Sequence, residues 1–111
     1  MYEVFQDKKY LYIVTELVKG GELYDEILSK GRFIEKNAAI LVRELLLTLN
    51  YLHKKGIIHR DLKPENIMLE ESKDFQNIKV IDFGTAAMIQ DGDKLTDRIG
   101  TPYYIAPEVL D

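Results

Sequence analysis

Residues 59–66 read His-Arg-Asp-Leu-Lys-Pro-Glu-Asn and form the most informative stretch of the chain. The stretch places a carboxylate, an ammonium and an amide close together between two apolar, strand-like segments. Asp61 could accept the proton of a hydroxyl, Lys63 could balance the charge of a phosphate, and Asn66 could offer a neutral oxygen to Mg²⁺. A polar, solvated loop is the alternative interpretation of these residues alone.

Two further motifs follow in the second half of the sequence. Residues 82–84 read Asp-Phe-Gly and come directly after the apolar run 78–81. A carboxylate at the end of a strand is well placed as a hard oxygen ligand for Mg²⁺. Residues 100–108 read Gly-Thr-Pro-Tyr-Tyr-Ile-Ala-Pro-Glu. Taken singly, the first of these motifs could be a plain turn and the second a surface turn with two prolines.

The chain around these motifs has a mixed pattern of strands and helices. Segments 2–5 and 10–17 are apolar and aromatic and predict two strands joined by a tight turn. Helical spacing predicts a helix over 22–30, which Gly31 would end as a C-cap. Short strands are expected at 57–58, 67–69 and 78–81, and residues 82–111 are expected to form a long ordered loop.

A long helix is predicted over residues 35–55, followed by Gly56 as a stop signal. Its apolar positions recur every three to four residues, and they include Leu41, Leu45 and Leu52. Further apolar residues such as Leu47 lie off this stripe, so we expect burial on more than one side of the helix. An all-helical bundle would be the interpretation of this segment taken alone.

Composition excludes several classes of protein. The 111 residues are 46% hydrophobic and 31% charged, with a formal net charge of −4, which argues against nucleic acid or an anionic membrane as a partner. The absence of cysteine excludes a disulfide framework and a thiolate metal site. The N-terminus lacks the pattern of a signal peptide, and no apolar run approaches the roughly 20 residues that span a bilayer. We therefore expect a soluble protein of the cytoplasm.

The three motifs, in this order and at these separations, resemble the signature set of eukaryotic protein kinases. The resemblance extends over the whole chain and implies an α+β, protein-kinase-like fold. It also implies that 1–111 is a partial kinase domain: 1–17 would be the end of the N-lobe and the hinge strand, and 18–111 a portion of the C-lobe with the catalytic loop and activation segment. Residues 20–27 and 97–101 are most similar to the calcium/calmodulin-dependent and calcium-dependent kinases.

The resemblance also implies roles for individual residues, with ATP and Mg²⁺ as cofactors. Asp61 would be the catalytic base, Lys63 would contact the phosphate, and Thr101 would hydrogen-bond both. Asn66 and Asp82 would be the Mg²⁺ ligands, and His59, Phe83, Gly84 and Glu108 belong to the structural part of the motifs. Lys63 and Thr101 are typical of Ser/Thr kinases, whose substrates are protein Ser/Thr hydroxyls.

The remaining assignments concern the nucleotide and activation. The carbonyl of Glu16 and the amide of Val18 would bind adenine, with Met68 beneath the ring. Glu22 would contact the ribose or a basic substrate residue. Thr15 would be the gatekeeper, although a structural strand residue is an equal interpretation. For Met68 the alternative is ordinary core filling, and both roles can hold at once. For activation, Asp97 stands where many relatives carry a phosphate and would pair with Arg60, with the adjacent Thr96 as the rival phosphosite.

Some features of kinases are missing from the sequence. There is no Gly-rich phosphate loop, no strand lysine of the Val-Ala-Ile-Lys kind and no paired helix glutamate. The absence of a Walker-type loop also argues against a general nucleotide-binding module. We therefore expect a fragment that is inactive alone, cut from a Ser/Thr kinase regulated through calcium/calmodulin-type segments outside this chain. The alternative is a non-catalytic truncated isoform or pseudokinase-like scaffold.

Overall fold

The structure is a computed structural model that describes residues 1–30, 33–90 and 92–110. It combines helices and short strands, as expected for an α+β chain. The predicted C-cap at Gly31 lies outside the described residues.

The chain begins with a hairpin of two exposed antiparallel strands, β1 (Glu3–Gln6) and β2 (Leu11–Val14). Asp7 closes the turn, because its carboxylate accepts hydrogen bonds from the backbone of Lys9 and Tyr10 and from the Tyr12 hydroxyl. The second strand is shorter than the predicted 10–17. The ladder ends where the Tyr2 amide donates to the Val14 carbonyl, and among the described residues no strand pairs with residues 15–17.

Two helices follow the hairpin. Helix α1 (Leu23–Lys30) begins one residue later than predicted, since Glu22 pairs instead with Met68 in an isolated β-bridge. Helix α2 (Glu35–Lys54) is the long predicted helix. It ends at Lys54, and Gly56 follows with a φ of 69°, a left-handed conformation that favours glycine, while its amide donates to the His53 carbonyl.

The hydrophobic core lies between α1, α2 and the hairpin of β4 (Ile67–Leu69) and β5 (Ile78–Val80). Phe33 and Phe75 meet edge to face there, with ring centroids 4.9 Å apart. The buried members of the core are Leu23, Leu41, Ile67, Leu69 and Phe75.

The prediction that α2 is buried on more than one side is wrong for the described residues. Leu46 and Leu47 are exposed at 59% and 49%, and Tyr51 at 62%. Leu41 and Leu52 are buried on the face toward the rest of the chain. The described parts of the chain therefore cover one side of the helix, and an apolar face remains in solvent.

The prediction of a loop over 82–111 is also wrong in part. Strand β6 (Ala87–Met88) pairs antiparallel with β3 (Ile57–Ile58), and the Ile89 amide donates to the Gly56 carbonyl. A short helix, α3 (Pro107–Leu110), closes the described chain. Proline at the first helical position and an acidic residue after it are ordinary starting signals for a helix, so this element was visible in the sequence.

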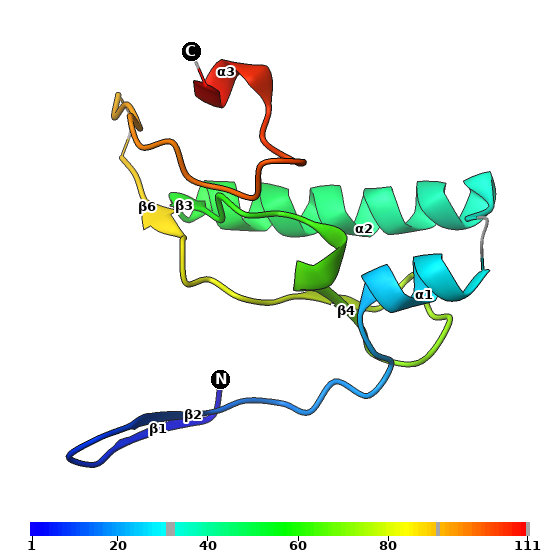
Figure 1. Ribbon diagram of the computed structural model, residues 1–111, viewed down its shortest axis with the longest axis horizontal. Coiled ribbons are helices and arrows are strands. Elements are labelled where there is room, and N and C mark those ends of the chain that lie inside the picture. Colours follow the sequence, from blue (N-terminus) through cyan, green and yellow to red (C-terminus); the bar gives the residue numbers. More distant parts are fainter. Residues whose placement is uncertain (31–32, 91, 111) are drawn as a thin grey trace.

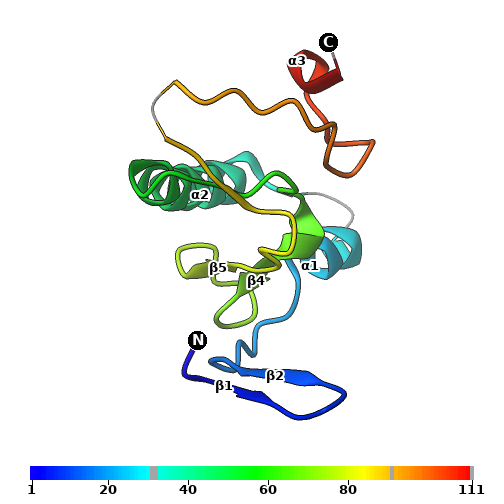
Figure 2. The same ribbon diagram turned by 90° about the vertical axis from the view of Figure 1, so that its left-hand side faces the viewer.

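The elements stack in layers along one direction (Figures 1 and 2). The β1–β2 hairpin lies at one end and α3 at the other, with the β4–β5 hairpin and the two longer helices between them (Figure 2). The 3₁₀ turn η1 (Pro64–Asn66) leads directly into β4. Residues 59–66 therefore connect β3 to β4 and end in this turn.

Candidate active site

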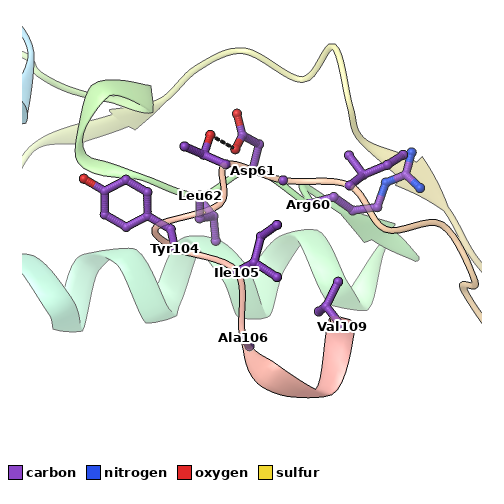
Figure 3. Close-up of a pocket in the computed structure, with 10 residues that line it drawn as sticks. Arg60, Asp61, Leu62, Tyr104, Ile105, Ala106 and Val109 are labelled. Carbon is purple, nitrogen blue, oxygen red and sulfur yellow. Dashed lines mark hydrogen bonds between the residues drawn. The ribbon is translucent and has the colours of Figure 1, made fainter. Parts of the chain in front are cut away.

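Asp61, Lys63 and Thr101 form one hydrogen-bonded group. The Lys63 ammonium lies 2.9 Å from Asp61 Oδ2 and donates to Thr101 Oγ1 at 2.8 Å. The Thr101 hydroxyl in turn donates to Asp61 Oδ1 at 2.6 Å, and Figure 3 draws this bond as a dashed line. The side chains of Asp61 and Lys63 are only 14% and 21% exposed. The group therefore holds a carboxylate and an ammonium in fixed positions with one edge open to solvent.

The same contacts set the charge of the group. The hydrogen bond from Thr101, and then the Lys63 ammonium, hold the pKa of the Asp61 carboxyl below its ordinary value of 3.8. The hydrogen bond to Asp61 raises the pKa of Lys63 above 10.5. Both groups are therefore ionised at neutral pH. Asp61 is therefore a weak base that is present as the carboxylate at neutral pH. Such a base suits a reaction in which orienting the hydroxyl matters more than removing its proton early.

Asn66 and Asp82 lie at the ends of neighbouring strands, beside this group. Asn66 Nδ2 donates to the carbonyl of Asp61 at 2.9 Å and to its carboxylate at 3.3 Å, which turns the amide oxygen of Asn66 away from Asp61. The Ile81 amide donates to the Asn66 carbonyl at 2.9 Å, so the residue before Asp82 is tied to Asn66. A carboxylate and an amide oxygen are donors that suit Mg²⁺. These two residues could hold such an ion.

His59 and Arg60 connect the loop to the segment after Asp82. His59 is 1% exposed, and its Nε2 donates to the Ile81 carbonyl at 2.9 Å while its ring packs against Phe83 at 4.9 Å. Arg60 Nε donates to the Thr85 carbonyl at 2.6 Å, and its Nη1 lies 3.2 Å from Asp97 Oδ2. The backbones of Arg60 and Asp82 are left-handed, with φ of 69° and 60°. Such strained residues persist where the surroundings fix them, and they concentrate at functional sites.

A cavity of about 610 Å³ lies between the segment after β2 and the β4–β5 hairpin. Its lining includes six residues singled out in the sequence: Thr15, Glu16, Val18, Met68, Asp82 and Phe83. The Glu16 carbonyl accepts a hydrogen bond from the Thr15 hydroxyl at 3.2 Å and keeps a second lone pair. Glu22 is outside this lining and pairs with Met68 through its backbone. The lining mixes apolar side chains with a few polar groups, as is typical of sites for small molecules.

Two further cavities flank the C-terminal segment. One of about 180 Å³ lies between residues 60–62 and 99–109, with Tyr104, Ile105 and Val109 around it (Figure 3). The other, about 470 Å³, is lined by Arg60, Thr96, Asp97 and Glu108 among others. The structure therefore gathers the residues expected for activation around Arg60. Thr96 is exposed, and among the described residues its hydroxyl makes no hydrogen bond.

Sequence reasoning missed two residues that shape the site. Lys79 on β5 lines the 610 Å³ cavity, and its ammonium contacts Glu16 and Glu70. Gly20 lies against β4, and a Cβ there would stand 2.4 Å from the Leu69 carbonyl oxygen. A lysine within a predicted apolar strand was an available signal for the first. For Gly20 the sequence offered no signal beyond the presence of a glycine.

Two features are absent from the described residues. No group of three or more His, Cys, Asp and Glu side chains in this part of the chain could hold a metal ion. Within the same described ranges, no helix is long and apolar enough to cross a membrane.

Comparison with known proteins identifies the family. The model of the protein kinase domain matches residues 1–111. The chain belongs to the protein kinase domain family. It is 49% identical over 111 residues to calcium-dependent protein kinase 4 of Plasmodium berghei and of Plasmodium falciparum, covering 99% of this chain and 21% of each relative. It is 44% identical over 110 residues to a probable myosin light chain kinase of Dictyostelium discoideum, covering 98% of this chain and 28% of the relative.

These findings confirm the expected resemblance to the calcium-dependent kinases. The chain spans between 21% and 28% of the length of these curated relatives. The strands and helices of the structure agree with a kinase-like fold.

Proposed function

We propose that the protein containing this chain is a serine/threonine protein kinase that transfers the γ-phosphate of ATP to protein hydroxyls. The observation that carries the proposal is the Asp61–Lys63–Thr101 group, an ionised carboxylate held 2.9 Å from an ammonium in a partly open site. Phosphoryl transfer asks a protein chiefly for positioning and charge, and this group supplies both.

In this mechanism the substrate hydroxyl donates a hydrogen bond to Asp61, which orients the oxygen and later accepts its proton. The Lys63 ammonium neutralises charge on the phosphate as it moves. Asn66 and Asp82 would hold Mg²⁺, which when bound neutralises phosphate charge. Thr101 keeps Asp61 and Lys63 in register, and its combination with Lys63 supports serine and threonine rather than tyrosine as substrates.

The 610 Å³ cavity supports a nucleotide site. We assign the Glu16 carbonyl and the Val18 amide to the adenine edge and Met68 to the face of the ring, since all three residues line the cavity. Glu22 would contact the ribose or a basic residue of the substrate. In this assignment residues 1–17 end the N-lobe and form the hinge strand, and 18–111 form part of the C-lobe.

We further propose that Asp97 does part of the work of an activating phosphate. Its carboxylate lies 3.2 Å from Arg60 Nη1, and the Arg60 side chain is 16% exposed while that of Asp97 is 65% exposed. A carboxylate offers less charge and fewer oxygens than a phosphate, but it is permanent. Control would then fall to other segments, and the names of the relatives suggest regulation by calcium.

The activation proposal is tested in the full-length protein after phosphatase treatment. We expect activity to survive, and Asp97→Asn and Arg60→Ala to lose activity non-additively because they break one contact. Strong inactivation by phosphatase, rescued by Thr96→Glu, would transfer the role to Thr96.

The catalytic proposal is tested by phosphorylation of Ser/Thr peptides with labelled ATP and Mg²⁺. Asp61→Asn keeps the shape and removes the proton acceptor, so we expect a loss of about 10²–10⁴-fold in kcat. A full-length wild-type protein that binds ATP without phosphorylating any protein or peptide would favour the alternative of a non-catalytic scaffold. Turnover of Asp61→Asn within threefold of wild type would show that another residue is the base.

A further inference from the structure

Lys79 connects two segments that border the 610 Å³ cavity. Its ammonium lies 3.1 Å from Glu16 Oε2 in the segment after β2, and 3.0 Å from Glu70 Oε1 just after β4. The side chains of Lys79, Glu16 and Glu70 are 35%, 48% and 44% exposed. One cation is therefore shared by two carboxylates at the rim of the cavity.

The register of the β4–β5 hairpin explains this position. Met68 and Lys79 stand directly opposite each other, and both line the cavity. Ile67 and Leu69, which flank Met68 on β4, are buried in the core. Since neighbouring side chains of a strand point to opposite faces, Met68 and Lys79 share the face that turns away from the core.

The segment that Lys79 reaches has few other anchors. The Val14 carbonyl accepts from Tyr2 at one end of the segment, and the Gly20 amide donates to the Leu69 carbonyl at 3.0 Å at the other. Among the described residues, no backbone hydrogen bond ties residues 15–19 to the rest of the chain. The ion pair between Glu16 and Lys79 therefore links residues 15–19 to β5 through side chains, where backbone hydrogen bonds do not.

We propose that Lys79 is a positioning residue for nucleotide binding: it holds the segment 15–18 at a fixed distance from Met68 and so sets the width of the adenine cavity. This inference rests on the proposed function. Lys79 acts through Glu16 and needs no contact with the nucleotide. Its pKa is raised by Glu70 and then Glu16, so it remains charged at neutral pH. Exposed ion pairs are weak, and we expect an effect of about two- to fivefold in affinity.

The test measures binding of adenosine to the full-length protein by calorimetry, alongside the kinetics of ATP. Adenosine carries no phosphate, so its affinity does not include attraction between Lys79 and the phosphates. Lys79→Met removes the charge and keeps most of the length, and Lys79→Arg keeps the charge. Glu16→Gln removes the partner while leaving the backbone carbonyl in place. Lys36→Met is the matched control, because Lys36 is an exposed lysine on α2, outside the cavity.

We expect Lys79→Met and Glu16→Gln each to weaken adenosine binding about two- to fivefold, and the double variant to weaken it no further. The KM for ATP should rise equally while kcat stays unchanged, and Lys79→Arg should bind close to wild type. Raised salt should weaken adenosine binding to the wild type and leave Lys79→Met unaffected. Lys36→Met should match wild type throughout.

Two results would overturn the inference while leaving the proposed function standing. One is unchanged adenosine binding by Lys79→Met with weaker ATP binding, which would make Lys79 a long-range charge for the phosphates. The other is unchanged binding of both molecules. A wild-type protein that binds neither adenosine nor ATP would instead refute the proposed function, and this inference with it.

Discussion

Replacing Thr101 by valine removes one hydroxyl from the site and keeps the shape of the side chain. That hydroxyl makes two hydrogen bonds to charged groups, to Asp61 at 2.6 Å and from Lys63 at 2.8 Å. Hydrogen bonds to charged groups contribute about 1.5–3 kcal/mol each. Asp61 and Lys63 are 14% and 21% exposed and keep their own 2.9 Å contact, so water and the ion pair offset part of the loss. We take about half of the sum, 1.5–3 kcal/mol, which is about 10- to 150-fold in kcat.

The loss should appear in kcat and not in the KM for ATP, because Thr101 does not line the nucleotide cavity. Removing the hydroxyl moves the pKa of Asp61 up toward 3.8, so the carboxylate stays ionised at pH 7 in both proteins. The lost rate would therefore come from geometry and not from protonation. The assay is steady-state phosphorylation of a peptide by the full-length protein, with Thr101→Ser as the control that keeps the hydroxyl. A kcat within threefold of wild type for Thr101→Val, in a protein that Asp61→Asn inactivates, would refute the reasoning.

Three other predictions concern the metal ligand, the isolated chain and the glycine at β4. Asp82→Asn should reduce kcat at least as much as Asp61→Asn and raise the Mg²⁺ concentration needed for half-maximal rate; an unchanged Mg²⁺ dependence would count against Asp82 as a ligand. The isolated chain of residues 1–111 should show no measurable phosphotransfer and should aggregate, because α2 exposes an apolar face; a cooperative melt with ATP-dependent peptide phosphorylation would contradict this. Gly20→Ala should lower the free energy of unfolding of the full-length protein by about 1–3 kcal/mol in denaturant titrations, since its Cβ would meet fixed backbone at 2.4 Å; an unaffected midpoint would show that the two segments can move apart.

The local sequence pattern was sufficient to predict the long helix. It predicted poorly those strands that form only by pairing with distant segments. The apolar spacing over 35–55 placed α2 to within one residue, because helical hydrogen bonds are local. Strand β6 was missed because residues 87–88 become a strand only by pairing with 57–58, far away in the sequence. The prediction carried β2 on to residue 17 because residues 15–17 look like a strand, but no strand in the described part of the chain pairs with them.

The same contrast between local pattern and distant contacts applies to the site. The chemistry of Asp61, Lys63 and Asn66 follows from residue types within one short loop. The partnership of Thr101 with Asp61 spans 40 residues and came only from the resemblance to kinases. Lys79 was missed because an apolar strand pattern says nothing about what its one charged residue contacts across the fold. Burial of α2 was overstated because periodicity shows which faces are apolar and not what covers them.

The hydrogen bond from the Ile81 amide to the Asn66 carbonyl makes the spacing of the two proposed metal ligands a matter of backbone register. Core side chains on the β4–β5 hairpin, such as Leu69 and Ile78, could therefore be varied in a designed library while Asn66 and Asp82 keep their separation. Insertions would be a different matter. One extra residue in either strand would shift one ligand by about 3.4 Å along the hairpin. Mg²⁺ needs its oxygens at about 2.0–2.1 Å, so neither of these short side chains would recover that shift.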